Sequence, residues 1–162
     1  MTIDALSLRR VLSHFATGVT VLATRHRAGG ACGLTANAFS SVSLNPPLAL
    51  VCVDRATRSY PCLVESRAFT ASFLSTGQTN LAVRFAGKED DKFDGVPVRT
   101  GVTGLPILEG AIGHVECELE AEHDGGDHAI LVASILSAGR DEGLPLVFFE
   151  SRYTTTAGHG PA

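Results

Sequence analysis

The feature that most restricts the fold is an alternation of apolar and polar residues that runs from His114 to Glu122. Strict alternation over this length is typical of a β-strand buried on one face, so we expect the histidine and glutamates of its polar face to contact water. The sequence Asp-Gly-Gly-Asp at 124–127 follows and is typical of a hairpin turn. Residues 128–138 then form a second run of β-branched and small residues. The pattern therefore predicts a long antiparallel hairpin.

Shorter runs rich in β-forming residues predict further strands. They lie at 19–24, 48–53, 69–74 and 146–149, and another strand ending at 32–34 forms a hairpin with the first through a turn at 27–30. The segment Asn45-Pro46-Pro47 is expected to be an extended connection, because a residue before proline avoids the helical region.

Helical signals are few and short. An amphipathic helix that stops at Gly18 is predicted near the start, on the apolar residues Leu8, Val11, Leu12 and Phe15. A second helix is predicted over 59–65, and a third begins with a capping box at 75–78 and ends near Gly87. About seven strands with only short connecting helices predict a mainly β fold, an antiparallel barrel rather than a doubly wound sheet.

Length and charge limit the organisation of the chain. Its 162 residues, 44% of them hydrophobic and 19% charged, favour one globular domain, expected over 1–153 with a flexible tail at 154–162. A net charge of −4 argues against nucleic acid as a partner. The absence of a membrane-length apolar run or of signal-peptide features predicts a cytoplasmic protein with no membrane partner.

The cysteines and histidines do not form a metal motif. Cys32, Cys52, Cys62 and Cys117 include no C-x-x-C pair and are interpreted as buried free thiols. The histidines are scattered along the chain, so no metal site is proposed.

Two polar segments are candidates for a ligand site. Residues 33–43 concentrate hydroxyls, an amide and small side chains, which can lie along a planar ligand and its phosphate. The alternative is a strand edge with hydroxyl turns. Residues 54–59, Asp-Arg-Ala-Thr-Arg-Ser, precede a helix and can bind an anion. The alternative there is an ordinary helix cap at Ser59 with solvated arginines.

Two further segments add aromatic and titratable groups. Residues 84–93 combine Phe85 and Phe93 with basic charges, which suits a phosphorylated flat ring, although a solvated loop over two buried phenylalanines is the alternative. At the turn, His128 can stack on or donate to a substrate while Asp127 fixes its tautomer; the alternative is an exposed turn histidine. No G-x-G-x-x-G follows a strand, so a nucleotide would be held in another way.

Several motifs, in order along the chain, resemble the short-chain flavin reductase family, the reductase components of two-component flavin-dependent monooxygenases. The resemblance covers about 8–153. The motifs are F-A-T-G-V-T-V at 15–21, T-A-N-A-F-S-S-V-S-L-N-P-P-L at 35–48, C-V-D-R at 52–55, D-K-F at 91–93, G-D-H at 126–128 and P-L-V-F-F at 145–149.

The resemblance implies a homodimeric FMN-binding split β-barrel, with FAD as a possible alternative flavin. The residues implied to face the isoalloxazine or ribityl chain are Thr35, Ala36, Asn37 and Ala38. The residues implied along the ribityl–phosphate end are Ser40, Ser41, Asp54, Ser59, Arg84 and Phe85. His128, with Asp127 beside it, would meet the nicotinamide. The segment Glu150–Tyr153 departs from the family's usual basic, glycine-containing sequence, so Arg152 and Tyr153 are given no role.

The function implied is an NAD(P)H-dependent flavin reductase. It would transfer hydride from NADH or NADPH to FMN or FAD and supply reduced flavin to a separate monooxygenase. The protein would provide stacking and orientation, since the redox chemistry belongs to the cofactors. The alternatives are a split-barrel flavin carrier or sensor without steady turnover, and an oxidase that acts directly on a small molecule.

Overall fold

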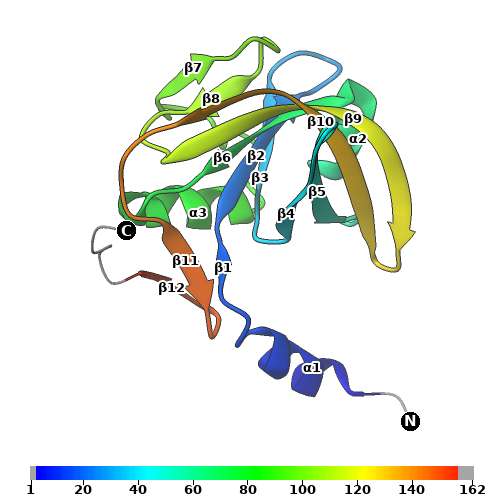
Figure 1. Cartoon of the computed structure of the whole chain (residues 1–162), viewed down its shortest axis with the longest axis vertical. Coiled ribbons are helices and arrows are strands. Elements are labelled where there is room, and N and C mark those ends of the chain that lie inside the picture. The colour runs from blue at the N-terminus through cyan, green and yellow to red at the C-terminus, as the bar shows by residue number, and fades with distance from the viewer. Residues whose placement is uncertain (1–2, 157–162) are drawn as a thin grey trace.

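The computed structural model describes residues 3–156, and its main element is a seven-stranded antiparallel sheet in the order β3-β2-β6-β9-β10-β5-β4 (Figure 1). The strands are β2 (Thr20–Arg25), β3 (Ala31–Ala36), β4 (Phe39–Leu44), β5 (Pro47–Asp54), β6 (Ala68–Phe73), β9 (Gly113–Gly125) and β10 (His128–Arg140). The sheet curls into an antiparallel split barrel with short helices, which confirms the predicted fold class.

The long hairpin β9–β10 is the backbone of this sheet. Its two 13-residue strands pair in antiparallel register from His128↔Gly125 to Arg140↔Gly113, with two register shifts. The hairpin prediction is confirmed, but the prediction of a uniformly wet polar face is wrong for His114 and Glu116, which are both buried.

A small hairpin that the sequence did not predict covers these two residues. It consists of β7 (Val98–Thr100) and β8 (Pro106–Leu108). Glu116 accepts hydrogen bonds from the backbone N–H of Val102 at 3.1 Å and from both the N–H and hydroxyl of Thr103 at 2.8 and 2.7 Å. Arg99 lies 3.1 Å from Nδ1 of His114. This end of the polar face is therefore buried because a folded loop supplies hydrogen-bond partners to Glu116 and His114.

These contacts shift the titration of Glu116 and His114. Burial by itself raises the pKa of Glu116, but the hydrogen bonds from Thr103 and Val102 outweigh it and bring that pKa below its ordinary value of 4.5. Burial, together with the charge of Arg99, lowers the pKa of His114. Both shifts make the folded state bind fewer protons than the unfolded chain, so acid weakens this part of the fold.

A separate three-stranded sheet joins the two ends of the domain. It contains β1 (Thr17–Gly18), β11 (Leu146–Phe149) and β12 (Arg152–Thr155) in the order β1-β11-β12. The strand at 146–149 was predicted, but it is not the last one, because Glu150 and Ser151 at positive φ turn the chain back into β12. Thr155 ends β12 beyond the boundary expected at residue 153, and residues 157–162 of the tail expected at 154–162 lie outside the described residues.

Three α-helices and a 3-10 turn complete the part of the chain that the structure describes: α1 (Ala5–Leu12), α2 (Tyr60–Ser66), α3 (Thr79–Ala86) and η1 (Thr76–Gln78). The predicted capping box is present, with Ser75 and Gln78 bonded reciprocally ahead of α3. Helix α1 ends at Leu12 rather than near Gly18, which pairs in β1 instead. In Figure 1, α1 extends away from the barrel, and none of its residues is buried. No helix within residues 3–156 is long and apolar enough to span a membrane.

The connection from β4 to β5 is tighter than expected. Asn45 and Pro46 form a two-residue turn, and Pro47 begins β5, so the predicted extended connection is wrong. Proline is compatible with this arrangement because it occupies the turn and the first position of a strand. The resulting edge strand β4 carries Ser40 and Ser41, which pair with Leu50 and Ala49.

The core has two clusters on opposite faces of β2. Leu22 packs inside the barrel with Phe69 and Leu131, whereas Val21 belongs to a second cluster with Phe85. Neighbouring residues of a strand point to opposite faces, so β2 is buried on both sides. Helix α3 supplies Phe85 to the outer cluster and thereby sets one wall of the candidate site.

Candidate functional site

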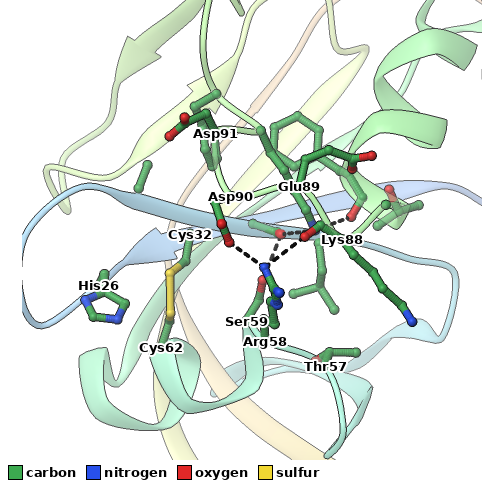
Figure 2. A pocket seen from close by; sticks show the side chains of 18 of the residues that line it. His26, Cys32, Thr57, Arg58, Ser59, Cys62, Lys88, Glu89, Asp90 and Asp91 are labelled. Atoms are coloured by element: carbon green, nitrogen blue, oxygen red, sulfur yellow. Dashed lines mark hydrogen bonds and ion pairs between the residues drawn. A yellow bond between two sulfur atoms is a disulfide. The ribbon is translucent and has the colours of Figure 1, made fainter.

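A pocket of about 1270 Å³ lies on the outer side of β3. Three segments enclose it: the β2–β3 turn with the start of β3, the turn that precedes α2, and the loop that follows α3 (Figure 2). The lining residues are His26, Gly29, Gly30, Ala31, Cys32, Gly33, Leu34, Thr35, Asp54, Ala56, Thr57, Arg58, Ser59, Cys62, Phe85, Ala86, Gly87, Lys88, Glu89, Asp90, Asp91, Lys92, Phe93 and Asp94.

Gly33 lets the strand approach α3 closely. A Cβ at this position would lie 2.8 Å from Cε1 of Phe85 and 3.0 Å from the carbonyl oxygen of Leu22, which is too close for any larger residue without displacement. The Gly33 carbonyl also accepts hydrogen bonds from the Ser59 hydroxyl at 2.8 Å and from Nζ of Lys92 at 3.2 Å. One glycine therefore joins all three walls of the pocket.

The turn before α2 is organised by Asp54. Its carboxylate accepts from the N–H of Ala56 at 2.8 Å, and its carbonyl accepts from the Thr57 hydroxyl at 2.9 Å. Ser59 occupies the N-cap position, but its side chain makes no capping hydrogen bond, because its hydroxyl is directed to Gly33. The buried Ser59 therefore connects the turn to β3, which the simple capping alternative did not include.

Three cationic side chains hold the loop after α3. Arg84 donates to the carbonyls of Asp91 and Asp94 at 3.0 and 2.7 Å, and Lys92 donates to the Phe85 carbonyl at 3.0 Å. Arg58 reaches from the opposite wall, donating to the Lys88 carbonyl at 3.0 Å and forming an ion pair with Asp90 (Figure 2). Burial lowers the pKa of Lys92, although the charge of Glu89 opposes the shift.

The aromatic residues of this region are packed against each other. Phe85 is fully buried, and its ring lies edge-on to Phe93 with the centroids 4.8 Å apart. Phe85 therefore supports the wall from behind, as the alternative of buried phenylalanines described, while the charged loop runs over it.

A disulfide between Cys32 and Cys62 links β3 to α2 along the pocket (Figure 2). The interpretation of these two cysteines as free thiols is wrong, since the fold brings residues 30 positions apart to a Cα–Cα separation of 6.5 Å. Cys117 and Cys52 are free, as expected, although only Cys117 is fully buried. Burial raises the pKa of Cys117 to about 12.

The hydroxyl-rich segment divides between the pocket and the sheet edge. The Thr35 hydroxyl, at the pocket, donates to the Ala82 carbonyl at 2.7 Å. Asn37 and Ala38 form the turn into β4, where the Ala38 carbonyl accepts from the N–H of Cys52 at 2.9 Å. Ser40 and Ser41 are exposed on β4, the arrangement that the strand-edge alternative describes.

The Asp127–His128 pair lies at the tip of the long hairpin. Nδ1 of His128 is 2.7 Å from the Asp127 carboxylate. The hydrogen bond and the charge of His128 lower the pKa of Asp127. Strand pairing sets His128 opposite Asp54, and the Arg55 N–H donates to the Asp127 carbonyl at 3.1 Å. The pair is therefore adjacent to the Asp54 end of the pocket without lining it.

Four of the predicted site residues line this pocket: Thr35, Asp54, Ser59 and Phe85. The predicted residues outside its lining are Ala36, Asn37, Ala38, Ser40, Ser41, Arg84, Asp127 and His128. Arg58 and Lys92 were not named individually as site residues, although Arg58 belongs to the predicted anion-binding segment 54–59 and Lys92 to the segment 84–93. Among residues 3–156, no group of three or more histidine, cysteine or acidic side chains is arranged to hold a metal ion.

The family model, the sequence relatives and the solved structures that match this chain indicate the same family. Residues 12–157 match the model of the flavin reductase like domain. The chain is 35% identical over 155 residues to the flavin-dependent monooxygenase reductase subunit HsaB of Mycobacterium tuberculosis, covering 94% of this chain and 82% of that protein.

Two solved structures are similar over nearly the whole chain. Nitrilotriacetate monooxygenase component B from Mycobacterium thermoresistibile aligns with a TM-score of 0.92 and 34% identity, over 98% of this chain and 91% of that one. Streptomyces globisporus NADH:FAD oxidoreductase SgcE6, in complex with NAD and FAD fragments, aligns with a TM-score of 0.89 and 37% identity, over 95% and 93%.

Proposed function

Because this chain belongs to the flavin reductase like domain family, we propose that the pocket outside β3 is its flavin site. The protein is an NAD(P)H-dependent flavin reductase that supplies reduced flavin to a separate monooxygenase. The observation that carries the site assignment is the pocket's combination of hydroxyls with Arg58 and Lys92 beside the buried ring of Phe85 and the partly buried ring of Phe93, a donor set that fits a phosphorylated flat ligand.

Of the proposed flavin contacts, Thr35, Asp54, Ser59 and Phe85 line the pocket, and the others belong to neighbouring segments outside its lining. Residues 35–38 face the isoalloxazine or ribityl chain, and Asp54 and Ser59 lie toward the phosphate end. Ser40 and Ser41 complete that end from the edge strand, and Phe85 supports the wall. Arg84 contributes by anchoring the loop through the carbonyls of Asp91 and Asp94. Bound flavin supplies the hydride-accepting chemistry.

His128 is proposed to position the nicotinamide rather than to transfer a proton. Its hydrogen bond to Asp127 at 2.7 Å fixes the orientation of the imidazole, and its pairing opposite the lining residue Asp54 supports a role next to the proposed flavin site. Hydride transfer at a ring carbon needs no protein proton, so orienting the reacting rings is the useful contribution.

A homodimer is proposed because no residue of α1 is buried against the rest of the described residues, 3–156. Its apolar residues Leu8, Val11 and Leu12 are exposed, as is Phe15 just beyond it, at 77%. Leu44 at the β4–β5 turn is 94% exposed. Exposed apolar groups of this size mark interaction surfaces, and light scattering should give twice the 16.9 kDa chain mass. We also propose a cytoplasmic location, since reduced nicotinamide is an intracellular cosubstrate.

Steady turnover tests the function. The purified protein is mixed with NADH and a large excess of FMN or FAD in air, and absorbance at 340 nm is followed. A reductase consumes many equivalents of NADH per chain, whereas a flavin carrier or sensor stops after at most one. The second flavin and NADPH, run in parallel, give the cosubstrate preferences.

A further inference from the structure

The guanidinium of Arg58 bridges the mouth of the pocket. It extends from the turn before α2, next to Ser59, and bonds the Lys88 carbonyl at 3.0 Å and the Asp90 carboxylate on the facing loop (Figure 2). Asp90 is 32 residues away in the chain. The pair therefore joins two walls that a ligand entering the pocket must pass between.

This ion pair is easily exchanged. The side chains of Arg58 and Asp90 are 68% and 85% exposed, and ion pairs between exposed groups contribute little to stability. A phosphate offers the guanidinium a bidentate, charge-assisted alternative. Asp90 thus occupies the position of an anion that a phosphate can replace.

The pocket lining has more acidic than basic side chains, so each cation, Arg58 included, matters for binding an anionic ligand. The acidic residues are Asp54, Glu89, Asp90, Asp91 and Asp94, and the basic ones are Arg58, Lys88 and Lys92. The net charge of this lining does not attract an anionic ligand, so each phosphate must bind directly to an individual cationic side chain. Lys92 lies at the inner wall on Gly33 and Phe85, whereas Arg58 is at the mouth.

The size of the pocket favours an extended ligand. Its volume of about 1270 Å³ is above the range of about 300–1,000 Å³ usual for small-molecule sites. Its lining continues past Cys32 to Gly29, Gly30 and His26 in the β2–β3 turn. A mononucleotide flavin leaves that extension unused, whereas an adenosine group can occupy it.

We propose that this pocket takes the dinucleotide FAD in preference to FMN, and that Arg58 is the specificity-determining residue. Arg58 releases Asp90 and binds the second phosphate, the one that FMN lacks. This proposal rests on the flavin reductase function above. It makes Asp90 an internal competitor of that phosphate.

The test is the ratio of FMN to FAD dissociation constants, measured by flavin fluorescence for wild type, Arg58→Gln and Asp90→Asn. We expect wild type to bind FAD more tightly. Arg58→Gln should lower the ratio about tenfold, the effect of about 1.4 kcal/mol, near the lower end for hydrogen bonds to charged groups. Asp90→Asn should raise the ratio severalfold by removing the competitor.

Arg55→Gln is the matched control. Arg55 belongs to the same turn, but its guanidinium bonds Glu122, Asp124 and Tyr60, so the ratio should stay at the wild-type value. Thermal melting of each variant checks folding, and the opposite change in Asp90→Asn cannot come from loss of structure.

Three results would overturn the proposal: equal affinity of wild type for both flavins, equal weakening of both by Arg58→Gln, or a raised KM for NADH with an unchanged flavin ratio. The last would assign Arg58 to the nicotinamide dinucleotide. The flavin reductase function fails separately, by absence of NADH turnover with either flavin in the wild type.

Discussion

Replacing Gly33 by alanine should damage both the fold and the flavin site. The new Cβ would lie 2.8 and 2.9 Å from two carbons of the Phe85 ring and 3.0 Å from the Leu22 carbonyl oxygen. Phe85 is fully buried and packs on Phe93, so the ring cannot move away freely. Overpacking of this kind costs about 1–3 kcal/mol.

The same substitution moves the carbonyl that Ser59 and Lys92 share. We therefore expect urea unfolding to show a loss of about 1–3 kcal/mol in the free energy of unfolding, together with severalfold weaker flavin binding by fluorescence titration. Phe85→Leu in the Gly33→Ala background should restore part of both, because a smaller side chain relieves the contact.

Gly77→Ala is the matched control for this prediction. A Cβ at Gly77 meets nothing within 4 Å, and its φ is not in the positive region, so alanine there should be neutral or stabilise by up to about 1 kcal/mol. The reasoning is refuted if Gly33→Ala unfolds within about 0.5 kcal/mol of wild type and binds flavin equally well.

Three other predictions concern separate parts of the molecule. Glu116→Gln should lower the free energy of unfolding at pH 7 by about 1.5–3 kcal/mol. Because the pKa of Glu116 is lowered in the fold, this contribution is present above pH 4.5 and is lost as pH falls through the folded pKa. The difference in free energy of unfolding between wild type and Glu116→Gln, measured with urea, should therefore be smaller at pH 3 than at pH 7. An equal difference at both pH values contradicts the prediction. Reduction of the Cys32–Cys62 disulfide, which spans 30 residues, should lower the free energy of unfolding by about 3–4 kcal/mol. Urea unfolding with and without excess dithiol measures this change. If the unreduced, denatured chain has four titratable thiols, the disulfide is absent. His128→Ala should mainly lower kcat/KM for NADH, with little change in flavin affinity, and Asp127→Ala should do so less; wild-type kcat/KM in His128→Ala would make the histidine an ordinary turn residue.

The elements predicted well from the sequence are those specified by local patterns. The hairpin β9–β10 follows from alternation and a glycine turn, and the capping box at Ser75 has its own short signature. The strands β7 and β8 are only three residues each, too short for a periodic signal. Burial of Glu116 depends on that hairpin folding over it, so alternation alone made the glutamate look solvent-exposed.

The site was only partly predictable for a similar reason. Its walls come from segments distant in sequence, and they meet through single contacts such as Lys92 to Gly33 and Arg58 to Asp90. Lys92 looked like one charge of a solvated run, and the pairing of Cys32 with Cys62 exists only once β3 lies beside α2. Motif resemblance identified the chemistry, whereas the positions of these side chains required the fold.

Hydrogen exchange with and without oxidised flavin shows whether the pocket outside β3 is the flavin site. We expect slower exchange on flavin addition at three places: the start of β3, the turn before α2 and the loop 88–94. The strands β7 and β8, none of whose residues lines the pocket, should exchange at an unchanged rate. Protection confined to other segments, with no change in these three, would contradict the assignment.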